Sequence, residues 1–143
     1  MRFMMLVIPK GYENAKPGTA PDAKAVAAMM KYNESLQKAG VLLALDGLQP
    51  PSTGARVTFT DGKPTVSDGP FSGRDLLAGF CIIQVASKQE AIDWVKRWPA
   101  LDGDGECEIE IRQVFEAEDF GEAFSPEMRE AEERMRAEAS ARQ

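Results

Sequence analysis

The sequence predicts an α+β fold, and two observations carry this prediction. Apolar runs with strand character alternate with two segments of helical periodicity, in the order strand, helix, hairpin, strand, helix, strand. Two helices that cover one face of such a sheet give a ferredoxin-like unit. A third helical segment follows the last strand. We therefore expect one α+β domain at residues 1–120 and a C-terminal helical tail at residues 121–143.

The first strand and the first helix are read from residues 3–40. Residues 3–8 are a continuous apolar run ended by Pro9, which predicts a strand buried on both faces. Helical periodicity begins at Asp22, and Gly40 is well placed to end the helix. The apolar stripe expected to face the core is Val26, Met29, Met30 and Leu36. Asn33 interrupts this stripe, so its amide lies either at the edge of the buried face or in a cavity.

The middle of the chain predicts four further extended segments. Residues 41–45 are short and apolar, and residues 80–85 are apolar enough for a central strand. Between them, residues 56–60 and 64–67 are strand-like and are separated by Asp61-Gly62. This dipeptide is a strong hairpin signal because both residues tolerate positive φ.

The second helix and the last strand have the clearest signals. Ser87 and Glu90 have the spacing of a capping box, and Pro99 ends the helical pattern. The buried stripe of this helix is predicted to be Ala91, Trp94, Val95 and Trp98. Residues 106–114 then alternate between an apolar and a charged face, which predicts a strand with one face in the core.

The tail is predicted to be a helix with a narrow apolar seam. Ser125 is a candidate N-cap and Pro126 occupies the first helical position. Pairs of opposite charge at residues 130/134 and 132/136 support the helix locally, and Met128, Ala131 and Met135 form the seam. Such a helix packs weakly on its own domain, which leaves two alternatives: it reaches a partner subunit or it frays.

Composition excludes several functional classes. The 143 residues carry a formal net charge of −6 and a sequence pI of about 4.8, which disfavours binding to phosphate backbones or anionic lipid without a local basic patch; the sequence shows no such patch. The N-terminal apolar run is too short for a signal peptide or a membrane span, and we expect a cytoplasmic protein. Histidine is absent, which excludes Ser-His-Asp and Cys-His nucleophiles and His-rich metal sites.

The face of the sheet opposite the helices must also be shielded from water. Two sheets paired face to face in a homodimer would supply it and would enclose a cavity between them. We therefore expect a homodimer that binds a small molecule. Cys81 and Cys107 lie among apolar strand residues, as is typical of reduced, buried thiols.

Five segments of the sequence together resemble the DGPF branch of the YCII-related proteins, and the resemblance extends over nearly the whole chain. They are Asp68-Gly69-Pro70-Phe71, the strand RFMMLVI, the turn DGLQPP, the helix SKQEAIDWVKRWP and the end EIEIRQVFEAEDFGEAFSPEMRE. The resemblance implies a dimeric α+β barrel, a possible enzyme, and for some members an association with extracytoplasmic-function sigma factors of bacteria. A histidine proposed as catalytic in smaller members corresponds to a position near Met29, so that role does not transfer to this chain. The Lys-Glu pair common after the turn is replaced by Arg74-Asp75, so a role that requires lysine does not transfer.

The turn supplies the candidate site. We expect Asp68 to act as general acid or base and Arg74 to hold an anionic or carbonyl oxygen. The ligand-binding candidates are Phe71, Asp75, Asn33 and Asp119. The alternatives are a tight turn stabilised by its own Asp, Gly and Pro, and an ordinary ion pair between Arg74 and Asp75. We expect no cofactor and no metal, because the Asp-Gly-Asp-Gly of residues 102–105 runs directly into a strand, unlike a calcium loop.

Overall fold

The computed structural model describes residues 1–18, 21–71 and 76–142. The chain divides into two compact units, Met1–Gln113 and Val114–Gln143, and each is described here by itself. None of the described helices is long and apolar enough to span a membrane.

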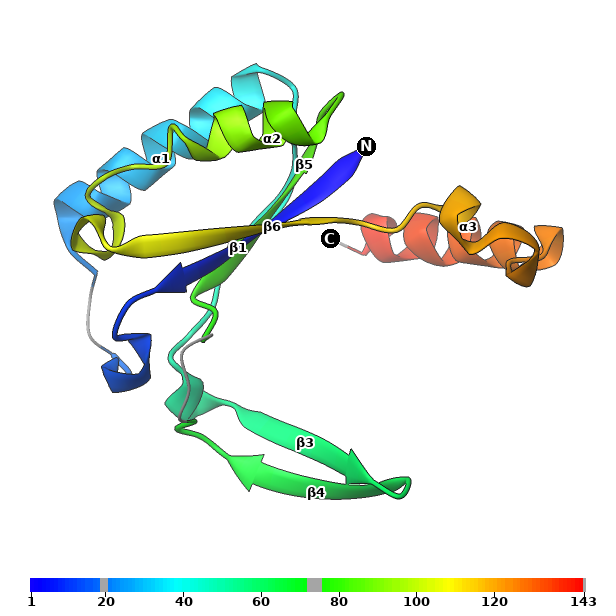
Figure 1. Ribbon diagram of the computed structural model, residues 1–143, viewed down its shortest axis with the longest axis horizontal. Helices are drawn as coiled ribbons and strands as arrows, with labels where there is room; N and C mark the ends of the chain where they lie inside the picture. Colours follow the sequence, from blue (N-terminus) through cyan, green and yellow to red (C-terminus); the bar gives the residue numbers. More distant parts are fainter. Residues whose placement is uncertain (19–20, 72–75, 143) are drawn as a thin grey trace. The chain divides into compact units, whose positions relative to one another are not determined.

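The first unit is organised around a four-stranded sheet (Figure 1). Its strands are β1 (Arg2–Pro9), β2 (Leu42–Gly47), β5 (Gly79–Gln84) and β6 (Cys107–Gln113), in the order β2-β5-β1-β6. All three pairings are antiparallel. Helices α1 (Ala23–Lys38) and α2 (Lys88–Val95) cover one face of this sheet. The order and the helix placement are those of a ferredoxin-like unit, so the predicted α+β fold is confirmed.

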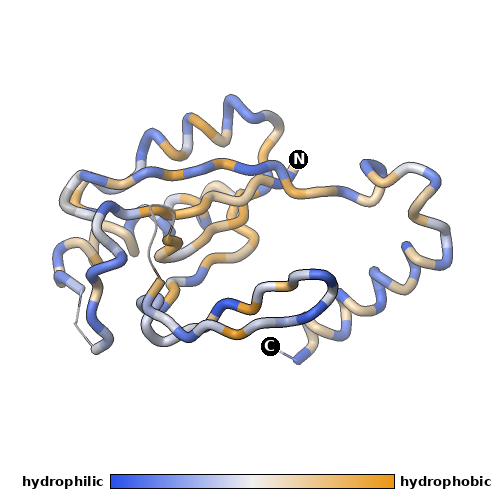
Figure 2. The backbone as a smooth tube through the Cα atoms, turned by 60° about the horizontal axis from the view of Figure 1, so that its bottom comes forward, coloured by the Kyte–Doolittle hydropathy of each residue, from blue (hydrophilic) through white to orange (hydrophobic). Residues whose placement is uncertain are grey.

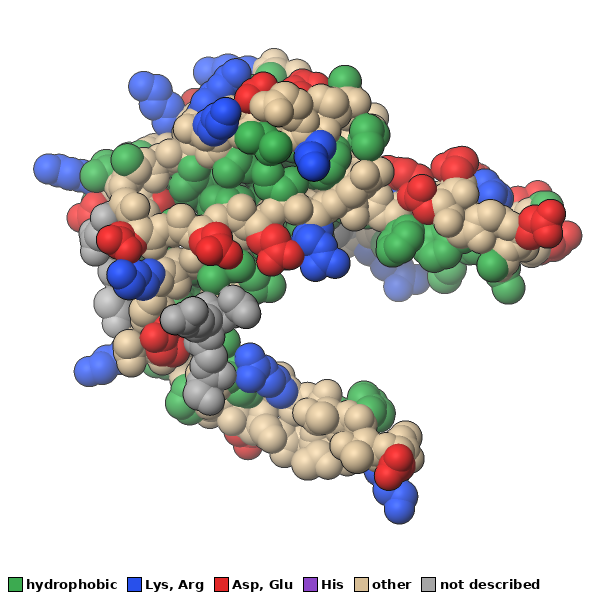
Figure 3. Space-filling model, in the orientation of Figure 1, with side chains coloured by type: hydrophobic (Ala, Val, Ile, Leu, Met, Phe, Trp, Pro, Cys, Tyr) green, Lys and Arg blue, Asp and Glu red, His purple; other side chains and the backbone are tan. Residues whose placement is uncertain are grey.

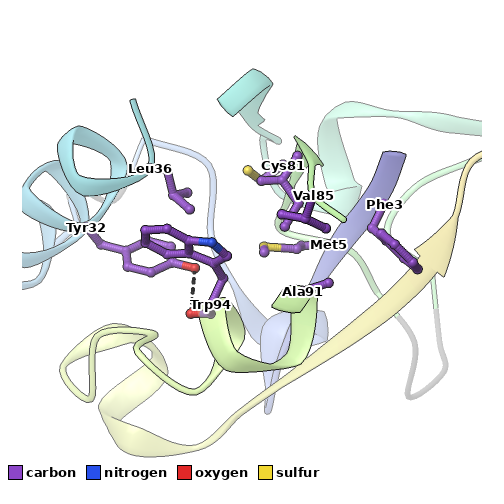
Figure 4. Close-up of a cluster of buried hydrophobic side chains, with 9 residues drawn as sticks. Phe3, Met5, Tyr32, Leu36, Cys81, Val85, Ala91 and Trp94 are labelled. Carbon is purple, nitrogen blue, oxygen red and sulfur yellow. Dashed lines mark hydrogen bonds between the residues drawn. The ribbon is translucent and has the colours of Figure 1, made fainter. Parts of the chain in front are cut away.

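The core lies between this sheet and the two helices (Figure 4). Figure 2 shows hydrophobic stretches along the strands of the sheet. Phe3 and Met5 of β1 are buried, whereas Met4 and Leu6, on the opposite face, are only partly buried. Because side chains alternate along a strand, one face of β1 meets the helices, and Met4, Leu6 and Ile8 lie on the other. Within this unit the predicted burial of both faces is found at Ile8, which is buried, but not at Met4 and Leu6.

The buried face of α1 differs from the predicted stripe. Val26 and Met30 were expected in the core, but they are 44% and 55% exposed. The face that meets the sheet contains Met29, Tyr32 and Leu36, which follow the same helical spacing with a different phase. The Asp22 carboxylate caps α1 by accepting a hydrogen bond from the Ala25 amide.

Helix α2 is held to α1 by a buried hydrogen bond. The Tyr32 hydroxyl donates to the Trp94 carbonyl oxygen at 3.0 Å (Figure 4). The predicted cap of α2 is confirmed, because the Ser87 hydroxyl accepts from the Glu90 amide at 3.1 Å. The helix ends at Val95, earlier than the predicted stop at Pro99.

A hairpin separates β2 from β5 along the chain. It consists of β3 (Ala55–Thr60) and β4 (Lys63–Asp68). Asp61 and Gly62 form its turn with φ of 50° and 75°, which confirms the predicted positive φ at both positions.

The second unit contains α3 (Pro126–Ala141), preceded by a 3-10 helix, Ala117–Ala123. The Ser125 hydroxyl caps α3 by accepting from the Met128 amide at 3.3 Å, as predicted. Phe120 lies between Phe115 and Phe124, with ring centroids 5.1 and 5.5 Å away. These ring contacts give the short unit an apolar cluster of its own.

Candidate functional site

A pocket of about 230 Å³ lies in the first unit between α1, β2, β5 and the segment that follows α2. Most of its wall is apolar, with three polar side chains among the lining residues. The lining residues are Val7, Met29, Asn33, Leu45, Asp46, Gly47, Ala78, Gly79, Phe80, Cys81, Trp98 and Asp102. An apolar cavity with a few polar groups is the usual form of a small-molecule site.

The strand side of the pocket depends on the close approach of β2 and β5. Asp46 is paired with Phe80, and Gly47 with Gly79. A Cβ atom at Gly79 would lie 2.9 Å from the Asp46 carbonyl oxygen, closer than such atoms can approach without movement of the backbone. Gly79 therefore allows β2 to lie where Asp46 lines the pocket.

Three lining residues have polar side chains: Asn33, Asp46 and Asp102. Asp46 is paired with Phe80 on the edge strand β2, so its side chain lies on the same face of the sheet as Phe80, opposite α1. The Trp98 indole N–H donates to Asp102 Oδ2 at 2.8 Å, which ties the segment after α2 to the pocket wall. Among the described residues, the side chains of Asn33 and Asp46 have no hydrogen-bonding or ionic partner. The Asn33 amide is therefore available to a ligand in the pocket, and the Asp46 carboxylate is available to a ligand group that extends around the edge strand β2. No Lys or Arg side chain is among the described residues that line the pocket.

Aromatic and sulfur groups form the inner wall. The Tyr32 and Trp98 rings contact each other edge to face, with centroids 5.2 Å apart. Burial raises the pKa of the Cys81 thiol to about 11, and burial also raises the pKa of Tyr32. Since a nucleophilic cysteine needs its thiolate, Cys81 contributes packing rather than a nucleophile at neutral pH. Cys81 and Cys107 are both free thiols, as expected.

The structure places the Asp-Gly-Pro-Phe turn at the end of β4. Asp68 is the last residue of this strand and is exposed. A Cβ atom at Gly69 would lie 1.8 Å from the Pro51 carbonyl oxygen, so only glycine fits this close contact. The Phe71 ring lies under the Arg56 guanidinium, 4.2 Å from its centroid. These contacts fit the tight-turn alternative left open by the sequence, and the acid–base role of Asp68 stays a prediction.

The remaining predicted site residues fall in three places. Asn33 lies in the pocket, which is the cavity alternative left open by the sequence. Asp119 belongs to the second unit, where its carboxylate accepts a hydrogen bond from the Glu116 amide at 2.7 Å and caps a 3-10 helix. Arg74 and Asp75 lie outside the described residues. Of the predicted residues that the structure describes, Asn33 alone lines this pocket.

Sequence reasoning missed three pocket residues. Asp46 was read as part of a turn, Asp102 as part of a loop and Trp98 as core. One signal was present for Asp46, because it is a carboxylate directly after a short apolar strand. Nothing local in the sequence shows that Asp102 meets the Trp98 indole near the same pocket.

The chain was compared with family models, with curated proteins and with solved structures. The family model described as YCII-related domain matches residues 1–118. A search of curated proteins finds no match. Among solved structures, the chain is similar to a 5-chloro-2-hydroxyhydroquinone dehydrochlorinase from Burkholderia phenoliruptrix AC1100, in complex with 2,5-dihydroxybenzoquinone. The two share 15% identity with a TM-score of 0.45, over 80% of this chain and 94% of that chain.

Proposed function

The chain belongs to the family of YCII-related domains, and we propose that it binds a small organic molecule in the pocket between α1, β2 and β5. The observation that supports this best is an apolar pocket in which Asp46 and Asn33 have no partner among the described residues. The resemblance places a histidine proposed as catalytic in smaller members near Met29, which lines the pocket; the role itself does not transfer, because this chain has no histidine.

Size and charge define the proposed ligand further. A cavity of about 150 Å³ holds a benzene molecule, so a pocket of about 230 Å³ has room for one substituted ring. Its polar groups are two carboxylates and an amide, with no cationic side chain among the described lining residues. Such a site favours a neutral hydrogen-bond donor or a cation over an anion.

The chemistry available to this pocket is proton transfer. Asp46 would accept a proton from a hydroxyl or ammonium group that extends from the pocket around the edge strand β2, and would return it, while Asn33 would orient the ligand in the pocket. A carboxylate performs this step without a metal or an organic cofactor, and we propose none.

Calorimetry with three ring compounds of matched size tests the proposal. Benzyl alcohol and benzylammonium should bind, and benzoate should bind at least tenfold more weakly. Asp46→Asn should abolish the preference for the cation, because it removes the negative charge. Glu108→Gln is the matched control, since Glu108 is also an exposed strand carboxylate but does not line the pocket. Equal binding of all three compounds, or equal effects of the two variants, would contradict the proposal.

Asp68 and Arg74 remain a second proposed acid–base pair, motivated by the turn that carries them. Their test is the same assay with Asp68→Ala and Arg74→Ala in correctly folded protein. Loss of affinity or turnover in these variants, with Asp46→Asn unchanged, would move the site to the turn.

We further propose a homodimer formed through the open face of the sheet. Met4 and Leu6 of β1 and Phe80 and Ile82 of β5 lie on this face and are only partly buried. Sedimentation equilibrium should therefore give twice the mass of the chain, and a monomer at micromolar concentration would contradict the pairing. The regulatory alternative, an association with a sigma factor in the bacterial cytoplasm, rests on the resemblance and is tested by pull-down from bacterial extract.

A further inference from the structure

The second unit has an apolar groove of about 310 Å³. Phe120 and Phe124 form one side, and Met128, Ala131 and Met135 of α3 form the other. Phe120, Met128 and Met135 are 48%, 54% and 62% exposed. Methionine-rich grooves of this kind adapt to an amphipathic helix of a partner.

The groove has an acidic border. Glu132 lines it and is paired with Arg136 of the same helix, and Glu138 follows Met135 by three residues and Ala131 by seven, so Glu138 lies along the same face of α3. Residues 114–143 contain four basic and nine acidic side chains, which gives a formal net charge of −5. Residues 1–113 contain 13 basic and 14 acidic side chains. Figure 3 shows hydrophobic side chains gathered on one side of this unit and acidic side chains on the other. The groove therefore fits a surface that is both apolar and basic.

The outer face of α1 has these two properties. Val26 and Met30 lie four residues apart and are 44% and 55% exposed. Ala23 and Ala27 lie on the same face and are also exposed, so a second element can approach the helix closely. The helix carries Lys24 and Lys31 at the side of this face; its single acidic residue, Glu34, follows Met30 by four residues and is paired with Lys38 at 3.8 Å.

Two other surfaces of the chain fit the groove less well. The hairpin has an exposed apolar face that includes Val57, Phe59 and Val66, but its charged residues are two basic and two acidic, so it offers no net positive charge. Two grooves facing each other would bring together units of charge −5 each. Charge complementarity therefore favours the outer face of α1 as the surface that binds the groove.

We propose that the groove of residues 114–143 binds the outer face of α1 from a second copy of this chain. Met30 and Val26 would enter the groove, and Lys24 and Lys31 would lie opposite Glu132 and Glu138. In a twofold dimer each copy gives one groove and one helix face, so the contact occurs twice.

Carbodiimide cross-linking of the full chain tests this contact. Equal amounts of ¹⁴N- and ¹⁵N-labelled protein are refolded together, treated with carbodiimide, and digested for mass spectrometry. Amide links from Lys24 or Lys31 to Glu132 or Glu138 should include peptides that join a light to a heavy copy. The ion pair of Lys10 and Glu106, 3.0 Å apart within the first unit, is the control and should give links within one copy alone.

Three results would overturn the proposal. Links from α1 to α3 within one copy only would show that the chain binds its own helix. Mixed links from Lys63 of the hairpin to the groove would show that the hairpin is the occupant. No link between α1 and α3, with the Lys10 control formed, would show that α1 does not reach the groove.

A charge exchange gives an independent test in solution. Lys24→Glu/Lys31→Glu and Glu132→Lys/Glu138→Lys should each weaken self-association about tenfold, because each opposes like charges across the contact. An equimolar mixture of the two variants should restore the association, since opposite charges then face each other at both contacts. Association in the mixture that is no stronger than the self-association of either variant alone would contradict the second-copy contact.

Discussion

Replacement of Tyr32 by phenylalanine tests how the two helices beside the pocket are held together. The hydroxyl of Tyr32, which is 6% exposed, donates to the Trp94 carbonyl oxygen at 3.0 Å. The phenyl ring would keep its packing, including the edge-to-face contact with Trp98. The substitution therefore removes one buried hydrogen bond and little else.

The expected loss of stability depends on whether the Trp94 carbonyl oxygen keeps another hydrogen-bond donor. The Trp94 carbonyl oxygen keeps the Arg97 amide as a donor at 3.1 Å, so no buried acceptor is left without a partner. The loss is then the net value of one neutral hydrogen bond, about 1 kcal/mol in the free energy of unfolding. For a chain of this length that is a fall in Tm of about 2–4 °C.

Thermal and urea denaturation of wild type and Tyr32→Phe measure this cost. Tyr12→Phe is the matched control, because the Tyr12 hydroxyl donates to the Leu48 carbonyl oxygen at 2.7 Å in an exposed position where water can replace it. Its effect should be a few tenths of a kcal/mol. An equal effect of the two substitutions would refute the account of the buried bond.

The difference in stability between wild type and Tyr32→Phe should also depend on pH. Burial raises the pKa of Tyr32, so the folded state keeps a proton that the unfolded state loses above its pKa of about 10. The stability contributed by this hydroxyl is complete below pH 10 and falls as the pH rises. The difference in free energy of unfolding between wild type and Tyr32→Phe should therefore be constant from pH 7 to about 10 and then decrease. A difference that grows above pH 10 would contradict the sign.

Two further predictions concern the turn and the thiols. Gly69→Ala should accelerate amide hydrogen exchange in the β3–β4 hairpin, because the added Cβ would lie 1.8 Å from the Pro51 carbonyl oxygen; unchanged protection would contradict the close contact. Burial raises the pKa of Cys81 to about 11 from an ordinary value of 9, so wild-type stability should fall between pH 9 and 11. This fall should be smaller in Cys81→Ala, measured by urea denaturation across that range, and an identical fall would refute the burial argument.

The elements with local signals were predicted well. The caps at Asp22, Ser87 and Ser125 and the Asp61-Gly62 turn depend on residues close together in the chain, so the sequence contains all the information.

The side of α1 that is buried could not be predicted in the same way. Two apolar stripes overlap on this helix, one with Val26 and Met30 and one with Met29, Tyr32 and Leu36. Both satisfy helical spacing, and contact with the sheet decides between them. Tyr32 is selected because its hydroxyl finds a buried acceptor on α2.

The pocket depends on pairings between distant segments, which explains why its carboxylates were missed. Asp46 reaches the pocket through the pairing of β2 with β5, and Asp102 through the Trp98 indole. The Asp68 turn was predicted as a site because its Asp-Gly-Pro-Phe sequence is distinctive, and the contacts that the structure describes there, at Gly69 and Phe71, stabilise the turn.

The proposed small-molecule site is tested most directly by the two tryptophan indole signals in a ¹H–¹⁵N spectrum. Trp98 lines the pocket, whereas Trp94 belongs to the core and does not, and the chain contains two tryptophans. Titration with benzylammonium should shift the Trp98 signal, assigned with Trp98→Phe, and leave the Trp94 signal nearly unchanged. Asp46→Asn should remove the Trp98 shift at the same ligand concentration. A Trp98 signal that stays in place, or a shift that persists in Asp46→Asn, would contradict a ligand site in this pocket.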